Sequence, residues 1–411
     1  MANLSAVADR PGLSTRVPDQ RAYRLQAIDM LRGLVIVIMA LDHVRDFFLF
    51  GTEQDPMANP NITAALFATR WITHFCAPVF VLLAGVSAGL IAARKSRGEL
   101  AWFLFTRGVW LIFAEVFLVS NLGTFSPLGV EAAGGLVIAS MQVIWAIGAS
   151  MVCLSFLQSL GRRTCLVLGV VIVAGHNLLD PIWPASRLLD QQWPVWVALH
   201  AQMTIHAGPF LVRFIYPVLP WVGVMSLGFG ISAVFEQAPA RRNAILLRAG
   251  AAMTCGFFLI RAAGIYGDSN PWQAQAAGAA ATIMDFLNTT KYPPSLDYLL
   301  MTLGPAAILC SFADRMTGRL KDALVVFGRA PFAFYLAHFF LIHTLSVCLG
   351  VAQGFTVHQM MTNYRFYPTG YGIGLPWVYV IWALVVLVLY PFCRWVASAK
   401  ARRRDWWLSY V

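Results

Sequence analysis

Long apolar runs separated by short polar segments dominate the chain from residue 29 to residue 397. A helix needs about 20 mostly apolar residues to cross the hydrocarbon core of a bilayer. Ten runs approach this length, and they predict an all-α fold, a polytopic integral membrane bundle of about ten spanning helices. The predicted spans are 29–50, 65–93, 100–121, 134–158, 164–180, 215–236, 244–266, 296–313, 323–350 and 375–397.

Three places in this pattern predict departures from a straight spanning helix. The second and ninth runs are long enough to tilt or bend, and Pro78 and Pro331 are the residues expected to kink them. Residues 195–212 are apolar but interrupted by histidine and arginine, so we predict an interfacial or re-entrant helix there. An eleventh span stays open.

The loops alternate in charge along this predicted topology. Most of the 30 lysine and arginine residues fall in the two terminal tails and in every second loop, whereas the opposite loops hold more acidic than basic residues. Because positively charged loops stay in the cytoplasm, both termini are predicted to be cytoplasmic. We therefore divide the chain into a cytoplasmic tail (1–25), a membrane domain (26–398) and a basic, aromatic cytoplasmic tail (399–411).

The composition excludes several classes of protein. The chain is 59% hydrophobic and 12% charged, unlike an ordinary soluble domain. The cytoplasmic loops account for its net charge of +11, so no nucleic-acid partner is expected. The 7 cysteines fall almost entirely in apolar runs and none has zinc-ligand spacing, so no metal is expected.

The first predicted span carries charge at both ends. A charged side chain inside a bilayer is costly and is rare without a function. Arg32 and His43 are eleven positions apart, which places them about 16 Å apart along a helix and on one face of it. Asp29 and Asp46 lie near the same face. Two other charged residues point elsewhere and are interpreted as structural: Asp42 and Arg45.

Charged residues of the first three spans fall into two layers across the membrane. The outer layer suits proton transfer, because histidine is the side chain best placed to act as a base near pH 7. The inner layer suits an anion arriving from the cytoplasm, such as a nucleotide phosphate. The outer layer holds His43, Arg70, His74 and Glu115, and the inner layer holds Asp29, Arg32 and Arg107. For any single residue, a purely structural ion pair stays the alternative.

The ninth run adds further polar residues to an apolar segment: Arg329, Tyr335, His338 and His343. The two histidines are five positions apart, hence about 140° apart around a helix, so one line along the helix does not hold both. We predict that His338 faces a cavity and that His343 is structural.

These residues lie in stretches that resemble a known family. The segment 28-IDMLRGLVIVIMALDHVRDFF-48 is similar to the first span of the heparan-alpha-glucosaminide N-acetyltransferase-like family, particularly its bacterial members, long labelled a domain of unknown function. The spacing of Arg32 and His43 also resembles the signature of the wider transmembrane acyltransferase superfamily, which includes the acyltransferase-3 O-acetyltransferases. Four further stretches extend the resemblance over roughly residues 24–397: 70-RWITHFCAPVFVLLAGVSA-88, 106-TRGVWLIFAE-115, 289-TTKYPPSLDYLLMTLGPA-306 and 327-FGRAPFAFYLAHFFLIH-343.

The resemblance implies a membrane-embedded acyltransferase that moves an acyl group, usually acetyl, from cytoplasmic acyl-CoA to a sugar hydroxyl or amine on the far side. It also implies that His43 is catalytic, as a base or as the carrier of the acyl group, and that Arg32 contacts the donor. We expect three further residues near the donor: Asp29, Arg107 and Arg329. Any of three residues is expected to orient His43: Glu115, Asp46 or His74. Three are expected to contact the acceptor: Arg70, Tyr292 and His338.

Two other functions stay open from the sequence. Charged spans with glycine and proline breaks also fit a secondary transporter of a small polar solute, and a non-catalytic membrane scaffold is the third interpretation. The expected partners are the lipid bilayer, acetyl-CoA or another acyl-CoA as co-substrate, and an extracytoplasmic glycan or amino sugar. The bacterial inner membrane is the expected location, and a dimer stays open. We expect Arg32 and His43 to border one continuous water-filled tunnel.

Overall fold

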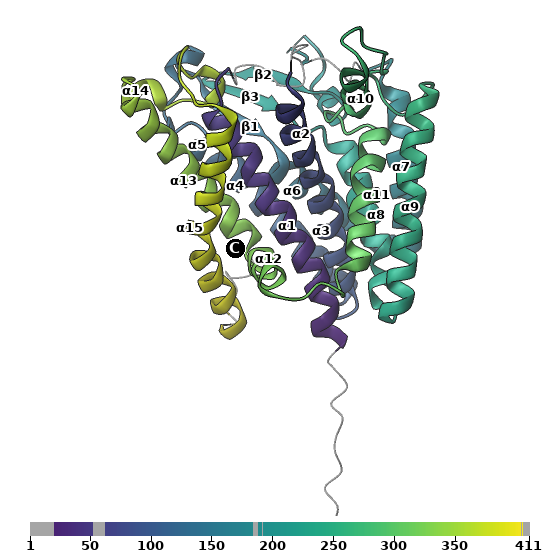
Figure 1. The fold of residues 1–411 in the computed structure, drawn as a ribbon. Helices are drawn as coiled ribbons and strands as arrows, with labels where there is room; N and C mark the ends of the chain where they lie inside the picture. Colours follow the sequence, from purple (N-terminus) through teal and green to yellow (C-terminus); the bar gives the residue numbers. More distant parts are fainter. Residues whose placement is uncertain (1–19, 52–61, 184–187, 191, 404, 406–411) are drawn as a thin grey trace, which may run out of the picture.

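The computed structural model describes residues 20–51, 62–183, 188–190, 192–403 and 405. Long helices run side by side in a bundle, with a small sheet and short helices at the end where α1 finishes (Figure 1). The helices are α1 (Gln20–Phe48), α2 (Ala64–Ile72), α3 (Cys76–Ala92), α4 (Arg97–Ala114), α5 (Ser120–Leu122), α6 (Val143–Leu157), α7 (Arg162–Gly175), α8 (Val218–Ile231), α9 (Pro239–Ala263), α10 (Ala279–Leu287), α11 (Leu296–Phe312), α12 (Arg319–Arg329), α13 (Pro331–Ala352), α14 (Val357–Met360) and α15 (Leu375–Arg402). The strands are β1 (Val137–Met141), β2 (Met203–Ala207) and β3 (Phe210–Phe214).

Eight helical segments of the described chain are long and apolar enough to cross a membrane. They are Ala64–Ala92, Arg97–Leu122, Val143–Leu160, Arg162–Leu179, Val218–Glu236, Pro239–Ala263, Pro331–Ala352 and Leu375–Arg402. The 29-residue α1 and the shorter apolar α11 run in the same bundle (Figure 1). The chain is therefore a multi-pass helical membrane protein. How many helices cross, and on which side the termini lie, stay predictions.

The predicted interfacial or re-entrant helix at 195–212 is wrong, because a short 3-10 helix and two strands occupy this stretch. After a short 3-10 helix (Val195–Leu199), β2 and β3 form a hairpin, and β1 pairs with β3 in parallel, so the strand order is β1-β3-β2. Gly208, in the hairpin turn, has a φ of +58°, a left-handed conformation that glycine adopts without steric cost. Because β1 precedes α6, the span predicted to begin at 134 begins only at Val143.

Pro331 starts a helix instead of kinking one. The predicted ninth span is divided into α12 and α13 at Ala330, whose φ and ψ of −125° and 46° are not helical. Proline has no backbone N–H and disfavours a helical conformation in the residue before it, so it suits the first turn of a helix. As a result, α12 is a separate amphipathic helix that packs against α1.

The second predicted span bends before Pro78. One 3-10 turn, Thr73–Phe75, separates α2 from α3. Pro78 is the third residue of α3, where a backbone N–H would have no partner within the helix. The bend brings Thr73 and Cys76 to the cavity beside α1 described below.

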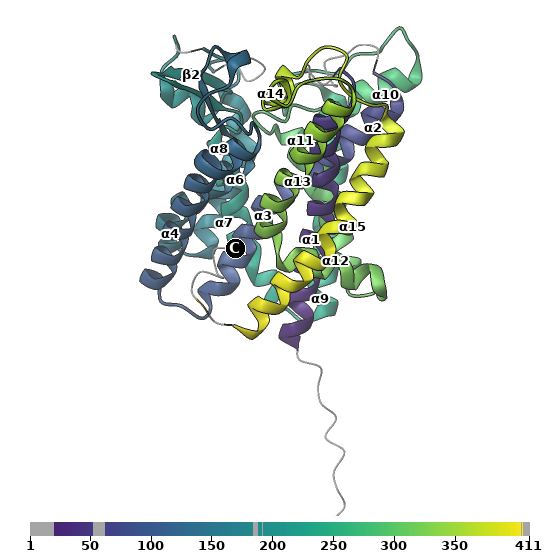
Figure 2. The same ribbon diagram turned by 90° about the vertical axis from the view of Figure 1, so that its left-hand side faces the viewer.

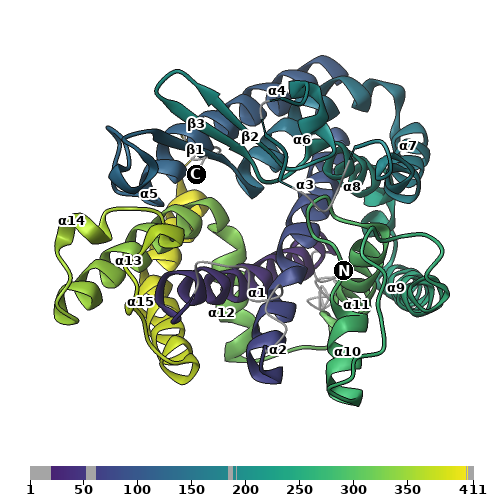
Figure 3. The ribbon, with the colours of Figure 1, turned by 90° about the horizontal axis from the view of Figure 1, so that it is seen from above.

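The helix α1 runs through the middle of the bundle, with α3 on one side and α13 and α15 on the other (Figure 3). Seen from the side, α4, α6, α7 and α8 form a second group of helices across α3 from α13 and α15 (Figure 2). Two glycines allow α12 to approach α1 closely. A Cβ atom added to Gly33 would lie 1.8 Å from the carbonyl oxygen of Leu324, and one added to Gly328 would lie 1.8 Å from that of Asp29.

Candidate functional site

His43 on α1 pairs with His338 on α13. Nδ1 of His43 lies 2.6 Å from Nε2 of His338, and Nδ1 of His338 lies 3.1 Å from the carbonyl oxygen of Phe334. A carbonyl only accepts hydrogen bonds, so Nδ1 of His338 carries the hydrogen, and Nε2 of a neutral His338 is the acceptor. His43 then donates from Nδ1 and keeps Nε2 unprotonated. The pair therefore gives His43 the tautomer that a base requires.

Aromatic rings of α13 surround this histidine pair. The ring centroid of Phe339 lies 4.4 Å from that of His43, and Tyr335 approaches the same imidazole edge-on at 6.2 Å. His338 is fully buried. An apolar shell of this kind strengthens the hydrogen bond between the two histidines, because little water competes for it.

His43 lines a cavity of about 30 Å³, enough for a water molecule or a small reacting group. The polar residues around the cavity come from five separate segments of the chain. They are Asp42 of α1, Thr73 of the 3-10 turn, Gln142 before α6, Tyr216 before α8 and Lys291 before α11. The fold thus gathers polar groups from distant parts of the sequence at one imidazole.

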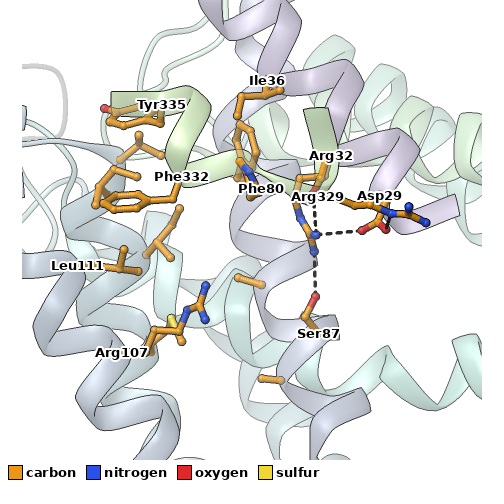
Figure 4. Close-up of a pocket in the computed structure, with 18 of the residues that line it drawn as sticks. Asp29, Arg32, Ile36, Phe80, Ser87, Arg107, Leu111, Arg329, Phe332 and Tyr335 are labelled. Atoms are coloured by element: carbon orange, nitrogen blue, oxygen red, sulfur yellow. Dashed lines mark hydrogen bonds and ion pairs between the residues drawn. The ribbon is translucent and has the colours of Figure 1, made fainter. Parts of the chain in front are cut away.

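A larger cavity of about 420 Å³ lies beside the middle of α1 (Figure 4). Arg32 projects into it and donates hydrogen bonds to Oγ of Ser87 at 3.0 Å and to the carbonyl oxygen of Gly328 at 3.3 Å. All four residues predicted to bind the donor line this cavity, together with a fifth charged residue: Asp29, Arg32, Arg107, Arg329 and Lys400. The charged lining is therefore strongly cationic, while most of the other lining residues are apolar.

The two cavities share part of their walls. Met39, Phe80 and Val143 line both of them. The single tunnel expected from the sequence is thus replaced by two cavities divided by three apolar side chains. Arg32 lines the larger cavity and His43 lines the smaller one, so the two residues lie on opposite sides of this shared wall.

A buried charge network lies next to His43. The carboxylate of Asp42 pairs with Arg45 at 2.8 Å and with Arg70 at 3.2 Å, and it accepts a hydrogen bond from Thr73 at 2.7 Å. Asp46 pairs with Arg45 at 2.5 Å. Arg70, predicted to contact the acceptor, and Asp46, predicted to orient His43, therefore both belong to an ion-pair network centred on α1. Asp42, interpreted from the sequence as structural, is part of this network and also lines the smaller cavity.

Glu115 and His74 line neither cavity. Glu115 is fully buried, and its Oε2 accepts the backbone N–H of Trp145 at 3.0 Å, so it caps the start of α6. The carbonyl oxygen of His74 accepts a hydrogen bond from the hydroxyl of Tyr298 at 2.7 Å. The hydrogen-bond partner of Nδ1 of His43 is His338, which is not one of the three residues expected to orient His43.

Tyr292 lies beside the smaller cavity rather than in its wall. Its ring packs edge-on against Tyr216 at 5.0 Å, and its hydroxyl donates a long hydrogen bond of 3.5 Å to the Tyr216 hydroxyl. Further out, Tyr364 packs against Phe47, one turn beyond His43. Burial raises the pKa of Tyr364 to about 12, so this phenol stays protonated near pH 7.

His343 makes contacts typical of a packing residue. Its Nδ1 lies 2.8 Å from the carbonyl oxygen of Leu122, and its Nε2 lies 3.1 Å from that of Met360. Its ring stacks on Phe125 at 3.9 Å. The imidazole therefore joins α13 to α5 and α14.

Four of the residues that complete the two cavities were not predicted from the sequence: Ser87, Gln142, Tyr216 and Lys291. Three of them lie just outside helices, where apolar periodicity carries no information. The sequence did hold a signal for Lys291, because it precedes Tyr292 in the KYPP turn, and Tyr292 was predicted to contact the acceptor.

Together, the fold and the site define a multi-pass membrane protein with an internal cation-lined cavity, separated by one apolar wall from a pair of hydrogen-bonded histidines. The family model described as heparan-alpha-glucosaminide N-acetyltransferase, catalytic, matches residues 24–261. Since this is more than half of the chain, the protein belongs to that family, which is one of membrane acetyltransferases. No curated protein matches the chain. His338 and Lys291 lie beyond the matched residues and are placed at the site by the structure alone.

Proposed function

We propose that this protein transfers an acetyl group from cytoplasmic acetyl-CoA to a sugar hydroxyl or amine on the opposite side of the membrane. The observation that carries the proposal is the position of the His43–His338 pair, one apolar wall away from a cavity lined by four cationic side chains. The family's description as an N-acetyltransferase supports the acetyl group as the one transferred.

The larger cavity has the chemistry needed to bind the donor. Coenzyme A carries several phosphate charges, and arginine is well suited to them because its planar group donates paired hydrogen bonds. Arg32 is held by Asp29 at 3.3 Å and by Ser87, and so it is preorganised. The side chain of Arg329 is 51% exposed and remains accessible at the mouth of the cavity.

The apolar part of the cavity suits the pantetheine arm of the donor. Ile36, Leu111 and Phe332 line the cavity together with the cations (Figure 4). In the proposed complex the arm passes Met39 and Phe80, and the thioester enters the smaller cavity. Those two side chains must move or rotate to admit it, which methionine does at little cost because it is unbranched and flexible.

His43 acts as the general base in this proposal. Its Nε2 takes the proton from the acceptor hydroxyl or amine as the acceptor attacks the thioester carbonyl carbon. His338 fixes the ring and accepts the hydrogen bond from Nδ1, so the developing imidazolium has a partner. When the intermediate collapses, the carbon–sulfur bond breaks, and the coenzyme A sulfur leaves with the proton that His43 holds.

Binding of acetyl-CoA to the purified protein in detergent tests the donor site. Arg32→Ala should raise the dissociation constant about ten- to a hundredfold, because a hydrogen bond to a charged group is worth about 1.5–3 kcal/mol. Arg94→Ala removes an exposed arginine of the turn after α3, which lines neither cavity, and should leave binding unchanged. Equal affinity of the wild type and Arg32→Ala, or no binding at all, would remove the donor assignment.

A further inference from the structure

Lys291 is a buried lysine in the segment between α10 and α11. The residue is only 9% exposed, and it lines the smaller cavity together with His43. Burying an ammonium group is costly unless it is paired or hydrogen-bonded. Within the described part of the chain, this ammonium makes no hydrogen bond or ion pair, and its contact is with the ring face of Tyr292, 5.2 Å from the centroid. Its hydrogen-bonding capacity is therefore directed to the cavity.

The acidic group of the same cavity does not neutralise Lys291 at close range. Asp42 is already engaged by Arg45, Arg70 and Thr73, with distances of 2.7 to 3.2 Å. The cavity thus presents His43, a base, and Lys291, a cation whose donors are not used by protein groups. A group that becomes negative during a reaction at His43 is the ligand that this pair fits.

The backbone around Lys291 is held in place. Lys291 and Pro294 form an isolated β-bridge. Just before it, the backbone N–H and the hydroxyl of Thr290 donate to Asp268 at 2.8 Å and 2.6 Å, and just after it the hydroxyl of Ser295 donates to the same carboxylate at 2.6 Å. A donor fixed in advance stabilises developing charge without reorganisation, and this is the main source of its effect on rate.

We propose that Lys291 is the oxyanion-stabilising residue of the acetyl transfer, an inference that rests on the proposed function. As the acceptor oxygen or nitrogen bonds to the thioester carbon, the carbonyl electron pair moves onto the carbonyl oxygen. The Lys291 ammonium donates to that oxyanion, while His43 holds the acceptor's proton. Return of the electron pair re-forms the carbonyl and expels the thiolate, which takes the proton from His43. The ammonium itself keeps all its protons throughout.

The test is steady-state release of coenzyme A from acetyl-CoA, with glucosamine as the acceptor probe, alongside acetyl-CoA binding. Lys291→Met should lower kcat about 10²–10³-fold, the usual cost of losing one oxyanion donor, and should leave the acetyl-CoA dissociation constant within about twofold. Lys291→Arg should recover part of the rate. Arg365→Gln, which removes an exposed cation of the same end of the molecule, is the matched control and should keep the wild-type rate.

Chemical rescue separates a direct role of the ammonium from a structural one. Methylammonium added to Lys291→Ala should restore part of kcat, because the truncated side chain leaves room for it, whereas a merely misfolded site would not respond. Wild-type kcat in Lys291→Met, or a loss of kcat that neither Arg nor methylammonium restores, would overturn the inference. If Lys291→Met is normal while His43→Ala is inactive, only this inference falls. If His43→Ala keeps the wild-type rate, or the wild type releases no coenzyme A, the proposed function falls with it.

Discussion

At the scale of single residues, the proposed function depends on one hydrogen bond between two helices. His43 and Arg32 were found from the sequence because the eleven-residue spacing puts them on one face of a helix. His338 was also singled out, but as a contact of the acceptor. Its actual position against His43, 295 residues away in the chain, follows from how α13 packs on α1, which helical periodicity does not report.

The proposed role of His338 as a positioning residue predicts that two substitutions lower activity to different extents. His338→Leu removes the acceptor for Nδ1 of His43 and should lower kcat about 10- to 100-fold, as expected when a partner that orients a functional group is lost. His338→Gln keeps an acceptor oxygen and should retain more activity. Acetyl-CoA affinity should not change in either variant. An affinity loss that parallels the loss of kcat would instead indicate a role in donor binding.

At the scale of elements, the helices were predictable and their junctions were not. Apolar runs predicted the long helices in the correct order, because lipid-facing and core-facing residues are both apolar. The hairpin of β2 and β3 was not predicted, for a related reason. Met203–Phe214 is apolar enough to resemble a membrane-interface helix, and only the two residues Gly208-Pro209 indicate a turn between two strands. The division of the ninth run depended on the placement of Pro331 in a first turn.

The contact between α1 and α12 predicts that a single methyl group disturbs the donor cavity. In Gly328→Ala the new Cβ would overlap the carbonyl oxygen of Asp29, so α12 must shift and carry Arg329 with it. We expect weaker acetyl-CoA binding and a loss of about 1–3 kcal/mol in unfolding free energy, typical of overpacking. Thermal unfolding in detergent and the acetyl-CoA dissociation constant measure the two effects.

Gly98→Ala is the control for this substitution. Gly98 lies in the first turn of α4, and a Cβ there meets open space. This variant should match the wild type in both measurements, since alanine is also the better helix former. If Gly328→Ala behaves in the same way, the close contact of α12 with α1 does not shape the donor site.

At the scale of the whole molecule, the proposed function depends on two cavities that share an apolar wall. The sequence predicted charged layers at two depths, and the structure gathers the inner layer around one cavity. The outer layer behaves differently: His43 lines the second cavity, while Glu115 caps α6 and Arg70 pairs with Asp42. Depth along a helix is readable from residue spacing, but which neighbour a polar group contacts depends on helix rotation and on loops such as the one that carries Lys291.

The most direct test of the central claim is mass spectrometry of envelope sugars from cells that express either the wild type or His43→Ala and are fed deuterated acetate. If His43 catalyses the transfer, one sugar class should carry a labelled acetyl group in wild-type cells and lack it in cells with the variant, with both proteins inserted in the membrane at equal levels. Identical labelling of the envelope sugars in the two strains would contradict acetyl transfer by His43.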